Sequence, residues 1–377
     1  MSDVLARPAP IAANAPAAPE LTIVVPVLNE RDNVRPLVER LRDVLAGIAW
    51  EVIFVDDDSR DGTRDAVADI GRTDPRVRLL HRIGRRGLSS AFIEGAQASI
   101  APTIAAMDGD LQHDETVLPK MLAALREGAD IAIGSRYVSG GGVGEWDAKR
   151  AGMSSFATRL SQLILRVPIA DPMSGFFMLR RETFDRAVRN LSAMGFKILL
   201  DIVASLPEPP KVREIPFTFR NRVAGESKLD AGVLRDYLLL IIDKLVGHVV
   251  PVRFILFAGV GAVGVAAHLV VLRLGLRVLG LDFPTAQALA TGCAIVGNFW
   301  LNNIFTFREG RLKGARALTG LLTFSVISCV GAVMNVNVAS VLFGSAHESW
   351  WFAGIAGAVM SLVWNYAVSS VFTWRRA

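Results

Sequence analysis

The sequence predicts an α/β domain built on a mostly parallel sheet, followed by an amphipathic helix and four transmembrane helices. Three observations lead to this prediction. Continuous apolar runs alternate with amphipathic stretches between residues 21 and 135, a pattern typical of parallel sheets that are covered by helices on both faces. Charged residues become rare after Phe254. Hydrophobic residues make up 51% of the 377 residues, which is high for a purely soluble protein.

Residues 1–20 are rich in Ala and Pro and contain no continuous apolar core. This composition is typical of a disordered tail and differs from that of a signal peptide. We therefore expect the domain that follows to stay in the cytoplasm.

Five strands are predicted from continuous apolar runs at residues 21–27, 51–56, 77–80, 103–108 and 130–135. Helices are predicted between them, at residues 31–48, after Gly62, around 87–99 and at 115–126. Polar clusters follow three of the strands: Asn29-Glu30, Asp56-Asp57-Asp58 and residues 108–112. Because ligands of open parallel sheets bind at the carboxyl ends of the strands, these clusters predict the site.

The cluster at residues 108–112 has the composition of a cation site. Asp108 and Asp110 are one residue apart, Gln112 adds a neutral oxygen, and Gly109 lets a ligand approach the backbone. Hard oxygen ligands suit Mg²⁺ or Mn²⁺, usually completed by substrate phosphates and water. A solvated acidic turn is the alternative, and the second acidic cluster at residues 56–58 favours the metal site.

Residues 229–250 carry charges at Asp230, Arg235-Asp236 and Asp243-Lys244, five to eight positions apart. One narrow polar stripe would then face a broad apolar side, which predicts a helix lying in the membrane interface. A helix buried in a domain core is the alternative.

Four apolar spans follow, each long enough to cross a hydrocarbon core of ~30 Å: residues 254–272, 286–305, 318–343 and 350–372. The link between the second and third spans contains Arg308, Arg311, Lys313 and Arg316, and the chain ends in Arg375-Arg376, whereas GLDFPT and GSAHES in the other two links contain no Lys or Arg. The positive-inside rule places both termini in the cytoplasm. Trp350, Trp351 and Trp374 are expected to form interfacial aromatic belts.

Three further features argue against a disulfide or metal-cluster protein, a nucleic-acid-binding protein and a dinucleotide-binding protein. Cys293 and Cys329 lie in apolar stretches and predict small core residues rather than a disulfide or metal cluster. The net charge of +5 is not gathered in a basic block, so a membrane surface or an anionic substrate explains it better than nucleic acid. The sequence GVGAVG at residues 259–264 matches a dinucleotide fingerprint but lies inside a span, where close helix packing is expected.

Asparagines within or near the spans, such as Asn298, Asn302 and Asn303, are expected to form interhelical hydrogen bonds. A polar path for a lipid head group or sugar is the alternative.

Five motifs occur in the chain in this order: VVPVLNE, VDDDSRDGT, MDGDLQH, GSRY and RVAGESKL. Together they resemble the family-2 glycosyltransferases with the GT-A (Rossmann-like) fold, and more narrowly the dolichol-phosphate mannosyltransferase and polyprenyl-phosphate glycosyltransferase branch. The four spans resemble the GtrA-like membrane domain that some of these enzymes carry. The resemblance implies a GT-A domain at residues 21–228, an interfacial helix at 229–250 and the membrane domain at 251–377. Asp114-Glu115 stands where the family often has prolines, a departure expected to have little consequence.

The resemblance also implies roles for individual residues. Those that match the nucleoside-binding positions are Pro26, Leu28, Glu30, Val55 and Asp57. Asp108 and Gly109 match donor contacts, and Asp110 and Gln112 match ligands of the Mg²⁺ or Mn²⁺ beside the diphosphate. The cations that match phosphate-gripping positions for donor and lipid acceptor are Arg136, Arg150, Arg222 and Lys228. Asp110 and Arg136 are the residues expected to act in catalysis.

The function implied is inverting transfer of a hexose from a nucleotide sugar to a polyprenyl or dolichyl phosphate at the cell inner membrane. The lipid phosphate is already an anion, so no strong general base is required, and the glycine-rich residues 139–146 are expected to form either an acceptor loop or a plain linker. GDP-mannose, UDP-glucose and UDP-N-acetylglucosamine remain open as donors, and the membrane domain could mediate homo-oligomer formation.

The sequence disfavours two other functions. A processive polysaccharide synthase should contain Q-x-x-R-W, which this chain lacks. A membrane protein that translocates or scaffolds a glycolipid would not need the acidic motifs that this chain retains.

Overall fold

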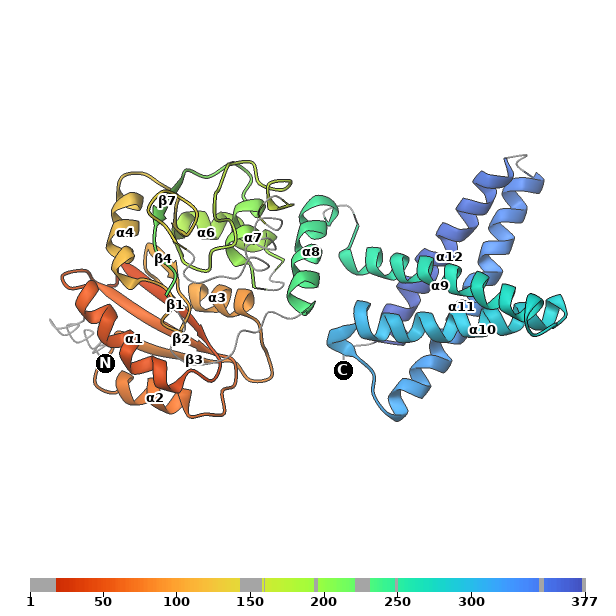
Figure 1. Ribbon diagram of the computed structural model, residues 1–377, viewed down its shortest axis with the longest axis horizontal. Helices are drawn as coiled ribbons and strands as arrows, with labels where there is room; N and C mark the ends of the chain where they lie inside the picture. Colours follow the sequence, from red (N-terminus) through yellow and green to blue (C-terminus); the bar gives the residue numbers. More distant parts are fainter. Residues whose placement is uncertain are drawn as a thin grey trace, which may run out of the picture. The chain divides into compact units, whose positions relative to one another are not determined.

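The computed structural model describes residues 18–142, 158, 160–192, 196–220, 231–247, 250–345 and 349–374. It separates into two compact units, Met1–Leu245 and Val246–Ala377. The first unit contains the sheet and the second contains the long apolar helices (Figure 1).

The first unit is built on a seven-stranded sheet with the strand order β3-β2-β1-β4-β6-β5-β7. The strands are β1 (Leu21–Val27), β2 (Trp50–Asp56), β3 (Val77–His81), β4 (Thr103–Ala106), β5 (Ile131–Ser135), β6 (Phe177–Arg180) and β7 (Val212–Pro216). All pairings are parallel except those of β6, which runs antiparallel to β4 and β5. The mostly parallel sheet and its five predicted strands are therefore confirmed.

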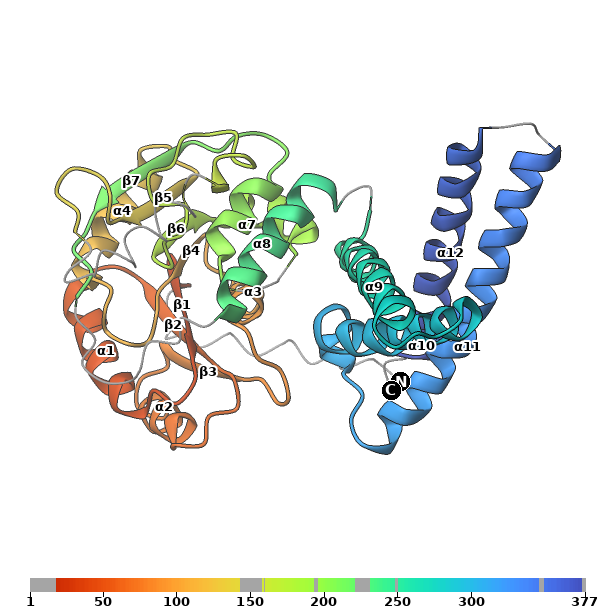
Figure 2. The same cartoon turned by 45° about the vertical axis from the view of Figure 1, so that its right-hand side comes forward.

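Helices cover both faces of the sheet, as Figure 2 shows. The helices are α1 (Arg31–Val44), α2 (Thr63–Gly71), α3 (Leu88–Gln97), η1 (Glu115–Val117), α4 (Leu118–Arg126), α6 (Arg181–Ala187), η2 (Val188–Asn190), α7 (Ile198–Ser205) and α8 (Ala231–Val246). Side chains of a strand alternate between faces, so Ile23 and Val25 of β1 pack with α1, α2 and α4, whereas Val24 packs with α3, α6 and α7. Continuous apolar strands are thus buried on both sides.

Helix α8 packs against the sheet unit with part of its apolar surface. Tyr237, Leu240 and Ile241 are buried against a cluster that includes Met173 and Leu200. Burial raises the pKa of Tyr237 to about 12. This side of α8 corresponds to the buried-helix alternative for residues 229–250.

An ion pair adds to this docking. Lys244 Nζ lies 2.6 Å from Asp201 Oδ1, and the Asp201 side chain is fully buried. Leu238 and Leu245, by contrast, remain exposed on α8.

The second unit contains α9 (Val252–Arg277), α10 (Phe283–Leu301), the π-helix η3 (Asn302–Thr306), η4 (Arg308–Gly310), α11 (Ala315–Ser340), the π-helix η5 (Val341–Ser345) and α12 (Trp350–Phe372). Three helical segments in the described part of the chain are long and apolar enough to cross a membrane: Val252–Arg277, Ala315–Phe343 and Trp351–Phe372. Three of the four predicted spans are thus supported. Helix α10 falls short because polar residues such as Gln287 and Thr291 dilute its apolar surface.

Several details of the second unit differ from the predictions. Helix α9 continues to Arg277 and includes Arg273, whereas the predicted span ended at residue 272. Trp374 is only 4% exposed and stacks on Phe307, so it belongs to a buried cluster instead of an interfacial belt. Cys293 and Cys329 are exposed free thiols on α10 and α11 and do not lie in the core.

The glycine motif at residues 259–264 lies within α9, as expected for helix packing. At Gly264, an added Cβ would collide with the side chain of Asn298 on α10, whereas Gly259 and Gly261 have nothing within 4 Å. The predicted close packing is therefore confirmed for Gly264 alone. Asn303 accepts a hydrogen bond from Trp374 Nε1 (3.1 Å), just beyond the end of α12, whereas Asn302 and Asn337 form hydrogen bonds within their own helices.

Candidate active site

The loops after β1, β2 and β4 lie side by side at the carboxyl ends of these strands, because the strands are neighbours and run parallel. Each loop contains a residue with positive φ: Asn29 (59°), Asp58 (65°) and Leu111 (62°), the only non-glycine residues of this kind that the structure describes. Such backbone conformations are uncommon outside glycine and cluster at functional sites. The strained positions therefore coincide with the three predicted polar clusters.

Hydrogen bonds join the loops after β1 and β2. The backbone N–H of Asn29 donates to Ser59 Oγ (2.9 Å), and Asn29 Oδ1 accepts from the N–H of Arg60 (3.0 Å). The N–H of Glu30 donates to Thr63 Oγ1 (3.0 Å), and Glu30 Oε2 accepts from Asn33 Nδ2 (2.6 Å). Glu30 is thereby held at the start of α1, facing the edge formed by the two loops.

Asp57 is fixed by the loop that follows β3. Asp57 Oδ2 accepts from the N–H of Gly87 (2.8 Å), and Oδ1 lies 3.1 Å from Nη1 of the buried Arg82. Burial raises the pKa of Asp57, although the Gly87 N–H and Arg82 counteract it. Asp57 Oδ1 makes no hydrogen bond with good geometry within the described chain.

The three apolar residues predicted to contact the nucleoside lie beside this pair of loops. Pro26 and Val55 are register partners on β1 and β2. The Val55 side chain is fully buried and packs with Val24 against Gly95 of α3, so only its backbone faces the site. Pro26 and Leu28 are partly exposed at the end of β1.

The acidic loop after β4 turns tightly against β1. Gly109 lies so close to β1 that an added Cβ would be 3.0 Å from Val27 Cγ1. Asp110 Oδ1 accepts from the N–H of Gln112 (3.2 Å), which fixes the carboxylate inside the turn. Asp108 is more exposed, and its carboxylate faces Gly175 at 3.3 Å from an added Cβ there. The structure therefore brings Asp108, Gly109, Asp110 and Gln112 together, as predicted.

His113 positions Asp108, a role that the sequence did not reveal. His113 Nδ1 accepts from the N–H of Asp108 (3.1 Å), so the ring proton lies on Nε2, which is 3.6 Å from Asp108 Oδ2. The ring is buried and stacks on Phe176 at 4.9 Å. Burial lowers the pKa of His113, so the imidazole is neutral at pH 7.

The acidic loop is also hydrogen-bonded to Arg220, which follows β7 in the chain. Gln112 Nε2 donates to the carbonyl of Arg220 (3.0 Å), and the N–H of Arg220 donates to the carbonyl of Gln112 (3.0 Å). The Arg220 guanidinium binds Asp114 (2.8 Å) and Glu115 (2.7 Å). The departure at Asp114-Glu115 thus has a structural consequence, because these acids anchor Arg220.

Arg136, at the end of β5, is held by a buried carboxylate. Its Nε and Nη2 donate to Asp171 at 2.7 and 2.8 Å, and its backbone N–H also donates to Asp171 Oδ2 (3.1 Å). Glu214 in turn accepts from the backbone N–H of Asp171 (3.0 Å). A bidentate pair of this kind fixes the guanidinium plane. Asp171 lies 35 residues away along the chain, and no local pattern pointed to it.

Lys197 is a second cation of the site that the sequence analysis missed. Its Nζ donates to the carbonyl of Met173 (3.1 Å). Its charge interacts electrostatically with Arg136, Asp171 and Asp108. Burial, reinforced by Arg136, lowers the pKa of Lys197 to about 8. The only feature of the sequence that could have indicated Lys197 is its place directly before an apolar helix.

The remaining predicted cations, Arg150, Arg222 and Lys228, lie outside the described residues, as do residues 143–146 of the glycine-rich stretch.

The described residues fit a metal site that is completed by substrate. No three His, Cys, Asp or Glu side chains of the described chain are grouped closely enough to hold a metal ion by themselves. Asp110 and Gln112 offer one carboxylate and one amide within a fixed turn. Mg²⁺ and Mn²⁺ bound to nucleotides commonly take one or two protein oxygens and complete their shell with phosphates and water.

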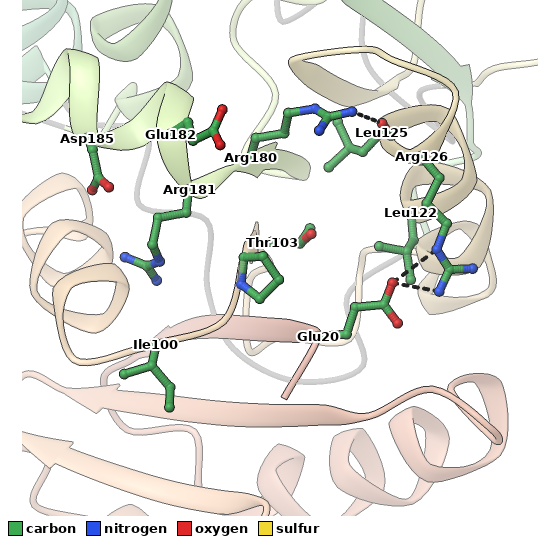
Figure 3. A pocket seen from close by; sticks show the side chains of 11 residues that line it. Glu20, Ile100, Thr103, Leu122, Leu125, Arg126, Arg180, Arg181, Glu182 and Asp185 are labelled. Atoms are coloured by element: carbon green, nitrogen blue, oxygen red, sulfur yellow. Dashed lines mark hydrogen bonds and ion pairs between the residues drawn. The ribbon is translucent and has the colours of Figure 1, made fainter. Parts of the chain in front are cut away.

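A cavity of about 620 Å³ lies elsewhere, near the amino ends of β1 and β4 (Figure 3). Glu20, Thr103, Arg126, Arg180 and Arg181 are among its lining residues. Its cations already have partners: Arg126 binds Glu20, while Arg180 and Arg181 donate to backbone carbonyls. The acidic loop lies at the carboxyl ends of the strands and the cavity lies at their amino ends, so this cavity is separate from the candidate active site.

Two family matches cover most of the chain. Residues 22–187 match "Glycosyl transferase family 2", and residues 256–374 match "GtrA/DPMS, transmembrane domain". Dolichol-phosphate mannosyltransferase of Pyrococcus furiosus is 35% identical over 94% of this chain and 99% of that protein. Polyprenol monophosphomannose synthase of Mycolicibacterium smegmatis is 31% identical over 59% of this chain and 85% of that protein.

Among solved structures, glucosyl-3-phosphoglycerate synthase of Mycobacterium tuberculosis, in complex with Mn²⁺, uridine diphosphate glucose and glycerol 3-phosphate, has 15% sequence identity. The structural match covers 60% of this chain and 80% of the synthase chain, with a TM-score of 0.44.

Proposed function

The chain belongs to the dolichol-phosphate mannosyltransferase family and is a polyprenyl-phosphate glycosyltransferase, and from this premise we propose its donor, its metal dependence and its stereochemistry. It transfers a hexose from GDP-mannose or a UDP-glucose type donor to a polyprenyl or dolichyl phosphate. The transfer depends on Mg²⁺ or Mn²⁺ and inverts the anomeric configuration.

The observation that carries this proposal is the alignment of three loops along one edge of the sheet. Glu30 and Asp57 lie on the loops after β1 and β2, and Asp108 and Asp110 lie on the loop after β4, the next strand. A nucleoside placed on the first two loops would direct its diphosphate towards the third. The strand order therefore supports a nucleotide sugar as donor.

Asp110 and Gln112 would hold the divalent cation, and when bound the cation would offset the negative charge that develops on the leaving diphosphate. The turn that fixes Asp110 to the Gln112 N–H holds the carboxylate in place before the donor arrives. His113 keeps Asp108 at the same edge by accepting its backbone N–H.

The cations of the site would bind the phosphates and align the reactants. Arg136 is oriented by Asp171, which leaves little freedom to its guanidinium plane. Lys197 lies within the field of Arg136 and Asp108 and is mostly protonated at pH 7, because its pKa is about 8. The acceptor phosphate is an anion at this pH, so its attack needs positioning rather than a general base.

The protein is a membrane protein, because the GtrA/DPMS match and three apolar helices support that class. We place α10 in the membrane as a fourth span, since it packs along α9 through Gly264 and Asn298. The cations at residues 308–316 and at Arg375-Arg376 favour a cytoplasmic location for both termini and the sheet unit. We place the protein in the cell inner membrane.

The proposal is tested with detergent-purified protein, a panel of nucleotide sugars and polyprenyl phosphate. Formation of a lipid-phosphate sugar from one donor, detected by mass spectrometry, is the expected result. The Asp110→Asn variant serves as the control for contaminating transferases. Purified protein that consumes no donor with any acceptor would leave only a role in glycolipid translocation or scaffolding.

Stereochemistry tests the single-displacement mechanism. A retaining double displacement needs a carboxylate nucleophile against the opposite face of the sugar, whereas we assign Glu30, Asp57, Asp108 and Asp110 to the nucleoside, the donor and the metal. An α-linked donor should therefore yield a β-linked product. Anomeric coupling constants measured by NMR distinguish the two outcomes, and an α product would exclude direct displacement.

A further inference from the structure

The second unit consists of two helical hairpins, and several residues of the first hairpin recur 67 positions later in the second. Phe257, Gly264 and Asn298 of the α9–α10 hairpin recur as Phe324, Gly331 and Asn365 of the α11–α12 hairpin. The hairpins also end alike, because the sequence Phe-Thr-Phe-Arg at residues 305–308 corresponds to Phe-Thr-Trp-Arg at residues 372–375. The matches fall at packing positions, although most other residues differ.

Burial follows the same repeat. Ala286 and Ala353 are 0% and 2% exposed, and the next helical turn buries Ala290 and Gly357. Further equivalent pairs are buried near the hairpin ends: Asn302 and Ser369, Thr306 and Thr373, and Phe307 and Trp374. Equal burial at equivalent positions indicates that the two hairpins use the same faces for packing.

Each hairpin is closed by the same glycine–asparagine contact. An added Cβ on Gly264 would collide with the Asn298 side chain, and one on Gly331 would collide with the Asn365 side chain. The Oδ1 atoms of both asparagines are buried without a hydrogen-bond partner among the described residues. The contact joins α9 to α10 in the first hairpin and α11 to α12 in the second.

Contacts between the hairpins obey a two-fold relation. They centre on an aromatic cluster of Phe257, Phe299, Phe307, Phe324, Tyr366 and Trp374. The contact of Phe257 with Tyr366 (5.6 Å) is repeated by Phe324 with Phe299 (5.9 Å). The stack of Phe307 on Tyr366 (26° between ring planes) is repeated by Trp374 on Phe299 (20°).

Two further contacts join equivalent residues directly. Phe257 lies 6.4 Å from Phe324, and Phe307 stacks on Trp374 at 4.2 Å with 6° between the ring planes. Exchanging the two hairpins converts each of these pairs into itself. The pairs therefore lie on the symmetry axis, as in an isologous interface.

We infer that the membrane unit is a tandem duplication of one helical hairpin, and that the aromatic cluster is the hinge between two internally rigid copies. Helix α10 occupies the place of α12, so a membrane crossing by α12 implies a crossing by α10 in the same direction. The inference rests on the repeat and its contacts and does not depend on the transfer reaction.

The hinge follows from the distribution of contacts. Packing is extensive between α9 and α10 and between α11 and α12, and it is sparse between the two hairpins. The α9–α10 hairpin crosses the α11–α12 hairpin (Figures 1 and 2). Two bodies that share one contact region rotate about that region.

Spin-label distance measurements on the full chain in nanodiscs test this inference. Cys293 and Cys329 are first replaced by Ser. Labels at Leu269→Cys and Val336→Cys, an exposed equivalent pair, report on the distance between hairpins. Labels at Val263→Cys and Phe283→Cys, both exposed on the first hairpin, report on its rigidity.

Trp374→Ala should broaden the distance distribution between hairpins and leave that within the first hairpin unchanged, and Phe307→Ala should do the same. Phe372→Ala, at an exposed position beside the cluster, should change neither distribution. Broadening of both distributions, or of neither, would overturn the hinge. Broadening by only one of Trp374→Ala and Phe307→Ala would overturn the equivalence of the copies.

The reciprocal exchange Phe307→Trp with Trp374→Phe addresses variants that fail to fold. It keeps both aromatic rings on the axis, so the exchanged protein should fold and retain narrow distributions. Loss of folding in the exchanged protein would contradict the two-fold relation.

Discussion

Lys197 stands directly before the first turn of α7, where the helix dipole disfavours a cation. Its environment also lowers its pKa to about 8, so the charged form costs free energy in the folded protein. A cation kept at such a position is typical of a binding group for an anion. Its proximity to Arg136, Asp171 and Asp108 indicates the donor phosphates or the lipid phosphate as that anion.

The pH dependence of the reaction should reveal Lys197. Below pH 8 its amine is protonated, and as pH rises through about 8 the charge is lost. We expect kcat/KM to fall over this range, because this parameter reports ionisations of the free enzyme. Lys197→Arg keeps its charge and should remove this alkaline decrease, whereas Lys197→Met should lower kcat/KM by ~10²-fold below pH 8, with a difference that shrinks as pH rises above 8. An unchanged pH profile in Lys197→Arg would exclude Lys197 as the titrating group.

Asp110→Asn should abolish transfer, with a loss of at least ~10²-fold, because the site would lose its carboxylate ligand for the cation. The side chain keeps its size and can still accept from the Gln112 N–H, so the melting temperature should change little. Stabilisation by Mn²⁺ with a nucleoside diphosphate should disappear in a thermal-shift assay. Full turnover of the wild-type protein in excess EDTA would contradict the metal dependence.

Site residues could be predicted from the sequence where one short loop contains several of them. Asp108, Asp110 and Gln112 lie within five positions, and the strand before them fixes their location. Lys197 and Asp171 come from segments far along the chain from the acidic loop, and only tertiary packing brings them there. A pattern in the local sequence carries no information about such contacts.

The same distinction applies to the strands. Strands β1, β2, β4 and β5 are continuous apolar runs that are buried throughout, and these four and the edge strand β3 were predicted. Strand β6 is antiparallel to its neighbours β4 and β5, an arrangement that the alternation of strands and helices did not indicate. Strand β7 carries Arg213 and Glu214, because it lies at the sheet edge, where charged side chains reach solvent. Strand β3 lies at the opposite edge but keeps the apolar pair Leu79-Leu80, which β7 lacks.

A buried ion pair adds to the apolar docking of α8. Lys244 contacts Asp201, Ser205 and the carbonyl of Asn190. Lys244→Met leaves the buried Asp201 carboxylate without its cation, which should cost ~3 kcal/mol or more of unfolding free energy. Hydrogen exchange of the α8 amides should become faster.

Arg213→Met provides the matched control for this change. Arg213 pairs with Glu127 on the surface, where both side chains are at least 60% exposed. Loss of such a pair should cost less than ~1 kcal/mol and leave α8 exchange unchanged. Equal effects of the two variants would show that the Lys244 ion pair does not hold α8.

The proposed orientation of the membrane unit rests on its cations. Four lie within residues 308–316 and two more at Arg375-Arg376, whereas the other end of α9 carries only Arg273 and Arg277. Reporter fusions at Ala377 and Glu348 should therefore report opposite sides of the membrane, with Ala377 cytoplasmic. Both fusions on one side would contradict a crossing by α12.

Residues 307–314 join the two hairpins as one polypeptide. Separate hairpins would associate according to their abundance in the membrane, whereas a short tether provides an effective concentration on the order of millimolar. Tethered copies can also accumulate different substitutions. A homodimer could place only two identical rings on its axis, but the fused chain stacks an indole on a phenyl ring. The bond from Trp374 Nε1 to Asn303, which has no counterpart from Phe307, is available only because the copies were free to diverge.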